Sequence, residues 1–322
     1  MFFGALQRSL AADRVVLSRP FVGPSWLTLT SQASRTRVRL GVQACRNIQH
    51  SAPGSGAEAF LEEAKPGISF LSLNRPKAKN AISLRLLKEF RECIDTVHND
   101  VLNSSARSHR VLILRSTTPN AFCAGADLVE RRTMSLAQVN TFLADLRAAL
   151  ALLEKLPVPT IAAIDGPALG GGLELALACD LRVAAHDVTK IGLPETKLGI
   201  IPGAGGTQRL TRLLGLAKAK NLIFTGRSLT AQDALDYGVV DYVSEPGTTA
   251  VDRALKLAEE IVTSAPLALQ AAKQAISKAP ELDLEHGLDF ERASYEVLLK
   301  SKDRLEALEA FKEKRAPVFK GE

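Results

Sequence analysis

Short, largely apolar runs alternate with longer amphipathic stretches over residues 68–184 of this 322-residue chain. Runs of this kind are typical of strands that are buried on both faces of a sheet. The stretches between them repeat apolar residues every three or four positions, which predicts helices that cover the sheet. The predicted strands are residues 68–73, 111–115, 160–165 and 181–184, and the predicted helices are residues 83–101, 135–156 and 172–178.

This alternation predicts right-handed β-α-β crossovers and a sheet with substantial parallel pairing, which places the chain in the α/β class. From residue 216 onward the pattern predicts helices alone. They are placed at residues 230–237, 251–264, 266–279, 284–299 and 301–314. The chain then divides into a linker over 51–66, a core over 67–260 and a C-terminal helical region over 261–322.

The distribution of charge separates the first fifty residues from the rest. The chain has 41 basic and 35 acidic residues, and residues 1–50 contain seven arginines and a single acid, Asp13. These carry the whole net charge of +6, so the other 272 residues balance 34 basic against 34 acidic side chains. An arginine-rich, acid-poor leader is typical of a mitochondrial presequence. We therefore predict import into the mitochondrial matrix, cleavage near residues 46–51 and a mature start within residues 47–60. A disordered basic tail is the alternative interpretation.

The composition excludes several other classes of protein. With 46% hydrophobic and 24% charged residues, the chain has the composition of an ordinary globular protein. The most apolar stretch, residues 147–179, is interrupted by Glu154, Lys155, Asp165 and three prolines, so no membrane span is predicted. Four cysteines without C-x-x-C spacing indicate buried thiols in a reducing compartment, and five histidines without ligand spacing predict no metal site.

Two segments rich in glycine and alanine carry the first candidate chemistry. They are FCAGAD at residues 122–127 and DGPALGGGLELALACD at residues 165–180. Each can present an unobstructed backbone N–H, and Gly171 does so at a predicted helix start, where the helix dipole favours negative charge. Together they predict a site that stabilises an oxyanion. Taken singly, the glycine triplet is also typical of close helix–strand packing, and FCAGAD is also typical of a plain turn.

Two glutamates are candidates for proton transfer. Glu174 stands on an otherwise apolar helix face, where burying a carboxylate is costly unless it has a function. Glu195 follows Pro194 in a predicted loop. From the residues alone, an exposed loop acid is the preferred interpretation of Glu195.

These segments resemble the crotonase superfamily, specifically the enoyl-CoA hydratases, over roughly residues 60–322. The stretches LPVPTIAAIDG at 156–166 and KDRLEALEAFKEKRAP at 302–317 carry the resemblance further. It implies a ClpP/crotonase-like spiral core of β-β-α units with a C-terminal α-helical trimerisation region, and a homotrimer or a homohexamer. It also implies an acyl-CoA thioester as the binding partner, with coenzyme A as part of the substrate and no separate cofactor.

The same resemblance assigns roles to individual residues. Ala126 and Gly171 supply the two oxyanion-hole N–H groups, Glu174 is the base that acts on water, and Glu195 is the acid. The implied reaction converts an enoyl-CoA to a 3-hydroxyacyl-CoA. Its substrate is 3-methylglutaconyl-CoA in leucine breakdown or a short-chain enoyl-CoA in fatty-acid oxidation. Because two neighbouring carboxylates resist joint ionisation, they are expected to titrate as a coupled pair.

Further contacts with the substrate and its CoA moiety are implied along the same segments. The loop IPGAGGTQR at residues 201–209 is expected to form a wall of the acyl pocket. Lys77 or Lys79 is expected near the CoA phosphates. The implied contact residues are Lys79, Ala124, Asp127, Leu128, Gly170, Gly172 and Pro194.

One departure from the family pattern bears on the placement of Glu195. The segment AAHDVTKIG at residues 184–192 is one residue longer than in the family, and a turn at His186 and Asp187 is expected to absorb the extra residue. An enoyl-CoA isomerase, or another crotonase reaction, is an alternative activity. The presence of both glutamates disfavours an isomerase that works with a single base.

RNA binding is the alternative of a different class. The candidate stretch is residues 79–93, whose basic residues are Lys79, Arg85, Lys88 and Arg91. We expect RNA binding to be weak, because the chain beyond the leader has no net charge and this helix offers no aromatic platform.

Overall fold

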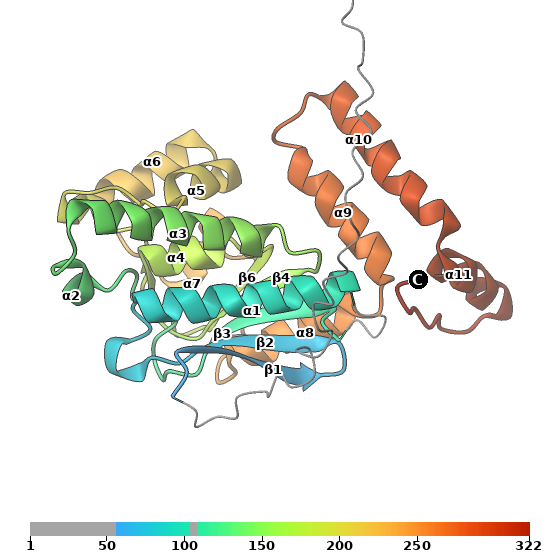
Figure 1. Ribbon diagram of the computed structural model, residues 1–322, viewed down its shortest axis with the longest axis horizontal. Helices are drawn as coiled ribbons and strands as arrows, with labels where there is room; N and C mark the ends of the chain where they lie inside the picture. Colours follow the sequence, from blue (N-terminus) through green and yellow to red (C-terminus); the bar gives the residue numbers. More distant parts are fainter. Residues whose placement is uncertain (1–55, 104–107) are drawn as a thin grey trace, which may run out of the picture. The chain divides into compact units, whose positions relative to one another are not determined.

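The computed structural model describes residues 56–103 and 108–322, which belong to a compact unit over Gln49–Glu322 (Figure 1). The predicted presequence, residues 1–50, lies outside the described residues. The unit is built on a six-stranded sheet in the order β1-β2-β3-β4-β6-β8. The strands are β1 (Ala59–Lys65), β2 (Ile68–Leu73), β3 (Val111–Ser116), β4 (Thr160–Ile164), β6 (Leu181–Ala184) and β8 (Tyr242–Val243).

Parallel pairing dominates this sheet, as the sequence predicts. Only β1 runs antiparallel to its neighbour within the described residues, and the register aligns Ile68 with Val111 and Ile113 with Ile161 in the parallel part. β2 and β4 are buried along their whole length. Their burial explains the continuous apolar runs, because both faces of these strands are covered.

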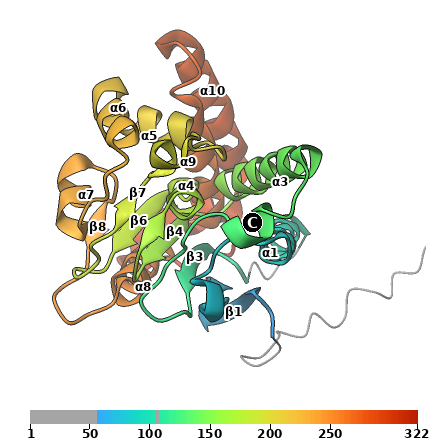
Figure 2. The ribbon, with the colours of Figure 1, turned by 90° about the vertical axis from the view of Figure 1, so that its left-hand side faces the viewer.

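Helices cover both faces of the sheet. α8 (Ala250–Ile261) packs against β3, β4 and β6, whereas α1 (Leu84–Asn103) packs against β1, β2 and α3 (Leu136–Glu154). Figure 2 shows α8 on one side of the sheet and the α1–α3 pair on the other. The buried residues of α1 repeat at the three-and-four spacing read from the sequence: Leu86, Leu87, Phe90, Cys93, Ile94, Val97 and Val101.

A second, two-stranded sheet positions the candidate chemistry. β5 (Ala168–Leu169) and β7 (Ile191–Gly192) pair in parallel, so their carboxyl ends lie at the same edge. α4 (Gly171–Leu177) begins just after β5, and the 3-10 helix η2 (Glu195–Leu198) begins just after β7. This pairing brings the glycine triplet and the segment that carries Glu195 together.

The remaining helices include a C-terminal group that is tied to the core. In this group, the Lys273 ammonium of α9 donates hydrogen bonds to the Val158 carbonyl at 2.9 Å and to the Asp180 carboxylate at 2.7 Å. The remaining elements are η1 (Pro76–Ala78), α2 (Leu128–Arg131), α5 (Gly206–Leu214), α6 (Leu216–Thr225), α7 (Ala231–Tyr237), α9 (Pro266–Lys278), α10 (Leu284–Glu296), η3 (Val297–Lys300) and α11 (Lys302–Glu313).

The structure corrects parts of the predicted organisation. The linker predicted over 51–66 is wrong for Ala59–Lys65, which form the edge strand β1. This strand buries only Ala59 and Phe60 fully, and its charged remainder hides the strand pattern from the sequence. Two further segments differ from the prediction. The region expected to be helical from residue 216 contains the strand β8, which is only two residues long and pairs with β6. The loop predicted over 201–209 ends at Gly206, where α5 begins.

α3 is, among the described residues, the one helix long and apolar enough by length and composition to cross a membrane. One face of α3 packs into the core, through Phe142, Leu146, Ala149, Leu150 and Leu153. The remaining surface of the helix carries exposed charges, including Asp145 and Arg147. The helix is therefore interpreted as a core helix, in agreement with the sequence-based prediction of no membrane span.

α4 packs so closely on the FCAGAD segment that only glycine fits at position 172. A Cβ added to Gly172 would lie 2.2 Å from the Cys123 carbonyl oxygen. We expect Gly172→Ala to lower the free energy of unfolding by about 1–3 kcal/mol, because the backbone of Cys123 must move. Urea unfolding of purified protein measures the change.

A matched control for this substitution lies in α10, where a Cβ on Gly287 meets nothing within 4 Å. Gly287→Ala is expected to raise stability by about 0.5–1 kcal/mol, since alanine is the better helix former. Equal stability of Gly172→Ala and the wild type would contradict the packing described here.

Candidate active site

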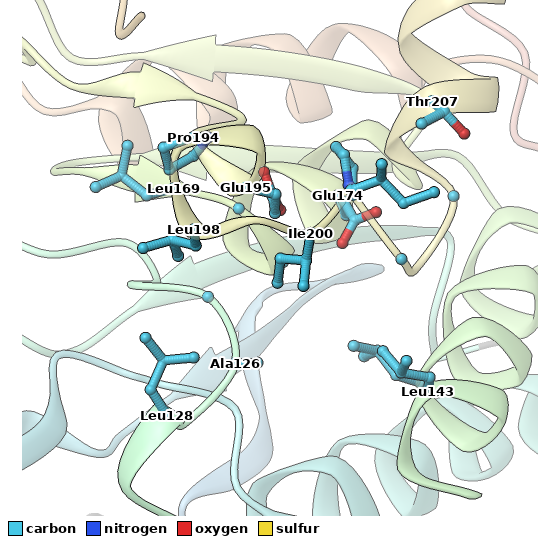
Figure 3. Close-up of a pocket in the computed structure, with 18 of the residues that line it drawn as sticks. Ala126, Leu128, Leu143, Leu169, Glu174, Pro194, Glu195, Leu198, Ile200 and Thr207 are labelled. Carbon is cyan, nitrogen blue, oxygen red and sulfur yellow. The ribbon is translucent and has the colours of Figure 1, made fainter. Parts of the chain in front are cut away.

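A cavity of about 830 Å³ opens where the FCAGAD turn, the start of α4, η2 and α3 meet. Figure 3 shows the two glutamates on one wall, with leucine and isoleucine side chains around them. Most of the lining is apolar, and Glu174 and Glu195 are its two carboxylates. A concave, mostly apolar pocket with a few convergent polar groups is the usual form of a small-molecule site.

Two backbone N–H groups meet on one side of this cavity. Ile82 donates its N–H to the Gly125 carbonyl at 2.7 Å and accepts from the Asp127 N–H at 3.0 Å. Because amides alternate in direction along an extended chain, these two hydrogen bonds leave the Ala126 N–H pointing away from Ile82. A Cβ built on Gly171 would lie 3.5 Å from the Ala126 nitrogen, so the two amides are neighbours.

Both N–H groups are available to an acceptor. Neither the Ala126 nor the Gly171 N–H donates a hydrogen bond to any acceptor in residues 56–103 or 108–322. Gly171 is the first residue of α4, whose first-turn amides have no partner within the helix. The structure thus brings together the two groups that the sequence assigns to an oxyanion hole, at a helix N-terminus that favours negative charge.

Glu174 lies on the first turn of α4 and is buried, with 3% of its surface exposed. Its Oε1 accepts hydrogen bonds from the Ala204 N–H at 2.8 Å and the Gly206 N–H at 2.7 Å. Burial raises the pKa of Glu174, and these N–H groups and the Arg209 charge offset only part of that rise. Arg209 also donates to the Ala204 carbonyl at 3.0 Å, which holds the loop against the carboxylate.

Glu195 begins η2, directly after Pro194, and 8% of its surface is exposed. Its Oε1 lies 2.9 Å from the position that a Cβ on Gly170 would take, and Gly170 has a positive φ of 54°. Its Oε2 is buried and has no hydrogen-bond partner among the described residues. Burial raises the pKa of Glu195 to about 7; its own N–H opposes the rise, and the charge of Glu174 adds to it.

The segment before Glu195, residues 184–192, turns where the sequence analysis expects it to turn. His186 and Asp187 form a turn after β6, and the Val188 N–H closes it on the Ala185 carbonyl at 3.1 Å. β7 then pairs normally with β5. This turn leaves Glu195 in the lining of the cavity.

The other predicted contact residues divide into two groups. Ala124, Leu128, Gly170 and Pro194 line the cavity. Three others do not, namely Lys79, Asp127 and Gly172. Lys79 is an exposed residue with a positive φ at the end of η1, and Gly172 packs on Cys123. For Lys79 and Asp127, contact with CoA stays a prediction.

Asp127 has a visible structural role at the end of the FCAGAD turn. Its Oδ1 accepts from the Val129 and Glu130 N–H groups at 2.9 and 3.0 Å, which caps α2. Its Oδ2 accepts from the Arg75 guanidinium at 2.7 Å, and Arg75 also contacts Glu58 at 3.2 Å. This chain of contacts fixes the turn that presents Ala126.

Sequence reasoning missed three arginines near the cavity. Arg131 and Arg147 line it, and Arg209 holds the loop that donates to Glu174. Arg147 has no local signal like that of Glu174, because it is an exposed charge on an amphipathic helix. The loop 201–209 supplies several lining residues, which supports its predicted role as a wall: Ile201, Pro202, Gly203, Gly205, Thr207 and Gln208.

The stretch considered for RNA binding is largely neutralised by its own acids. Arg85 pairs with Glu89 at 2.7 Å, and Lys88 lies 3.8 Å from Glu92 on the same helix face. Arg91 approaches Asp95 at 4.0 Å. Such pairs reduce the charge available to phosphates. The described part of the chain also contains no group of three or more histidine, cysteine, aspartate or glutamate side chains that could hold a metal ion.

Comparison with known proteins places this site in a family. A family profile described as Enoyl-CoA hydratase/isomerase matches residues 63–322. Enoyl-CoA isomerase/hydratase fer4 of Mycosarcoma maydis is 55% identical over 276 residues, which cover 85% of this chain and 98% of that protein. Mitochondrial methylglutaconyl-CoA hydratase of Rattus norvegicus is 50% identical over 265 residues, which cover 81% of this chain and 82% of that protein.

Solved structures agree with these sequence comparisons. The crystal structure of enoyl-CoA hydratase from Bacillus anthracis matches with a TM-score of 0.78 at 45% identity, and covers 82% of this chain and 100% of that one. The enoyl-CoA hydratase structure from Geobacillus kaustophilus HTA426 matches with a TM-score of 0.77 at 35% identity, and covers 82% of this chain and 97% of that one. These matches confirm the predicted α/β crotonase fold.

The raised pKa of Glu195 predicts how the free energy of unfolding depends on pH. A carboxyl group whose folded pKa is about 7, against an ordinary value of 4.5, binds its proton more tightly in the folded state. Its contribution to stability is therefore fully present below pH 4.5, falls as the pH rises towards 7, and stays lost above that. Glu195→Gln removes this titration, so its stability relative to the wild type should increase from pH 5 to pH 8, by on the order of 3 kcal/mol at most. Urea unfolding at both pH values measures it, and a difference independent of pH would contradict the assignment.

Proposed function

This chain belongs to the enoyl-CoA hydratase/isomerase family, and we propose that it is an enzyme that adds water across the α,β double bond of an enoyl-CoA thioester. One observation carries the proposal. Two unpaired backbone N–H groups stand beside two buried carboxylates in one cavity, and environment alone gives the carboxylates different roles. Coenzyme A is part of the substrate, and the proposed reaction requires no separate cofactor.

The geometry fits this reaction step by step. The thioester oxygen accepts hydrogen bonds from the Ala126 and Gly171 N–H groups, which stabilise the negative charge that develops when water attacks C3. Glu174, held in place by two backbone donors, takes the proton from the attacking water. Glu195, which keeps its proton to about pH 7, delivers that proton to C2. Proton exchange between the two carboxyls then restores the starting state.

An isomerase is the second activity to weigh, since the fungal relative is named for both reactions. Moving a double bond from C3 to C2 needs one group that carries a proton between two carbons. Adding water needs two groups, one for the water and one for carbon. Two buried carboxylates facing one cavity support the hydratase, so isomerisation is not the favoured activity.

The substrate of this chain is proposed from the same cavity and from the relatives. The named activity of the rat relative supports 3-methylglutaconyl-CoA, and a short-chain enoyl-CoA is the alternative. An apolar cavity of about 830 Å³ is large enough for a short branched acyl chain with part of the pantetheine. Ala124 and Leu128 line the cavity beside the Ala126 amide and are proposed to contact the pantetheine.

Assembly into a trimer or a hexamer is proposed for the C-terminal region. Its helices carry large apolar side chains that are mostly exposed, including Leu284 at 79%, Val297 at 73% and Phe311 at 86%. Apolar exposure over neighbouring helices is typical of a surface that packs against another chain. This exposure supports the trimerisation role that the family resemblance implies for the region.

Both glutamates are needed in this mechanism, which gives a direct test. We expect Glu174→Gln and Glu195→Gln each to lower kcat on crotonyl-CoA by at least about 100-fold, the usual scale of lost acid–base catalysis, with little change in binding of the CoA ester. Steady-state kinetics and titration with a non-reacting acyl-CoA separate the two quantities. Wild-type turnover in either variant would show that the paired-carboxylate mechanism is wrong.

Mitochondrial location is proposed from the leader and from relatives that are named as mitochondrial proteins. We propose a narrower range for the start of the mature chain than the sequence alone predicts. The Gly56 carbonyl accepts from Arg85 at 2.8 Å, and the Glu58 carboxylate accepts from Ser83 at 2.7 Å, so residues from 56 onward are anchored to the core. N-terminal sequencing of protein from cells should therefore find a start within residues 47–56. Intact Met1 in a cytosolic fraction, or a start beyond Glu58, would contradict this.

A further inference from the structure

Arg147 lines the active-site cavity without an acidic partner. It lies on α3, one turn after Leu143, and its Nε donates to the Leu143 carbonyl at 3.2 Å. No carboxylate within the described residues forms an ion pair with it. Its neighbour Arg209 is different, because Glu154 holds that guanidinium at 2.8 Å. Arg147 thus brings a free positive charge to a cavity whose lining is mostly apolar.

The order of groups along the cavity fixes which part of a substrate meets Arg147. Gly170 lies beside Glu195 and Gly171 lies beside Ala126, whereas Glu174 lies against the loop that contains Gly206. Figure 3 shows this order, with Leu128 and Leu198 at one end, Glu195 and Glu174 in the middle, and Leu143 and Thr207 at the other end. Arg147, one turn from Leu143, belongs to the Thr207 end.

A bound thioester must follow the same order. Its carbonyl oxygen lies at the Ala126 and Gly171 amides, and C2 and C3 lie under the two carboxylates. The sulfur and the pantetheine then leave towards Leu128, and the acyl chain beyond C3 extends past Glu174 towards Leu143 and Arg147. The cation therefore faces the far end of the acyl chain rather than the CoA moiety.

We propose that Arg147 binds a carboxylate at the far end of the acyl chain, so that the enzyme prefers enoyl-CoA substrates that carry a second, terminal carboxylate. The inference rests on the proposed hydratase function and on its proposed substrate 3-methylglutaconyl-CoA, whose acyl chain ends in a carboxylate. It adds the residue that selects this substrate class. A guanidinium matches a carboxylate with two parallel N–H donors. An alkyl chain at the same place covers the cation and offers it no acceptor, which is unfavourable.

A different use of Arg147 is contact with another part of the assembly. It also borders a second cavity of about 950 Å³, between α3 and the C-terminal helices, whose lining includes Glu154, Lys155 and Asp180. In that case its removal would affect all substrates alike. The test therefore compares two substrates that differ only in the terminal charge.

The substrates are glutaconyl-CoA and its uncharged isostere 5-methylhex-2-enoyl-CoA, in which an isopropyl group replaces the carboxylate. The ratio of their kcat/KM values is measured for the wild type, Arg147→Leu, Arg147→Gln and Arg147→Lys. Lys155→Leu is the matched control, because it removes a nearby positive charge that borders only the second cavity. Circular dichroism and the elution volume of each variant establish that it is folded and assembled.

We expect the wild type to prefer glutaconyl-CoA, and Arg147→Leu and Arg147→Gln to lower the ratio about tenfold or more, the scale of one charge-assisted hydrogen-bonded contact. Arg147→Lys should retain part of the preference, and Lys155→Leu should change the ratio less than about twofold.

Three results would overturn the proposal. The first is equal loss on both substrates in Arg147→Leu, and the second is an unchanged ratio. The third is a wild type that hydrates the isostere but not glutaconyl-CoA, which would leave the hydratase function standing. If the wild type hydrates neither compound and does not hydrate crotonyl-CoA either, the proposed function is overturned, and this inference with it.

Discussion

The close approach between the FCAGAD turn and the glycine triplet is the constraint on which the rest of the site depends. Gly172 packs on the Cys123 carbonyl, and a Cβ on Gly125 would lie 2.9 Å from the Leu169 carbonyl. No side chain fits between the two backbones at these points, so the Ala126 and Gly171 amides can face one acceptor. The hydrogen bonds of Ile82 to both sides of Ala126 keep the turn in that orientation.

The same packing determines the chemistry of the two glutamates. Parallel pairing of β5 and β7 delivers both carboxylates to one edge, where burial raises the pKa of each. Two backbone donors compensate Glu174, whereas Glu195 Oε2 lacks a partner among the described residues and its carboxyl also faces the charge of Glu174. In the proposed mechanism, one site thereby holds a base and an acid of the same residue type at neutral pH, because their surroundings differ.

Much of this arrangement could be predicted from the sequence, wherever the spacing of apolar residues within one segment indicates which of its positions are buried. The four main parallel strands, the helix at α1 and the unusual position of Glu174 follow from apolar periodicity alone. Glu195 has no local signal and required the family resemblance, because its burial comes from β5 and the α4 start, which are distant in sequence. The edge strand β1 has no clear strand pattern because most of its length faces solvent. The structural role of Asp127 has no local signal either, because its partner Arg75 lies 52 residues away in the chain.

In the proposed reaction, the cavity directs water to C3 of the acyl chain rather than to the carbonyl carbon of the thioester. The most direct measurement is mass spectrometry of the products formed from crotonyl-CoA in H₂¹⁸O. The account predicts 3-hydroxybutyryl-CoA with the label on its C3 hydroxyl group and with the thioester intact. Free coenzyme A with the label in a carboxylate, or an isomerised enoyl-CoA without label, would contradict it.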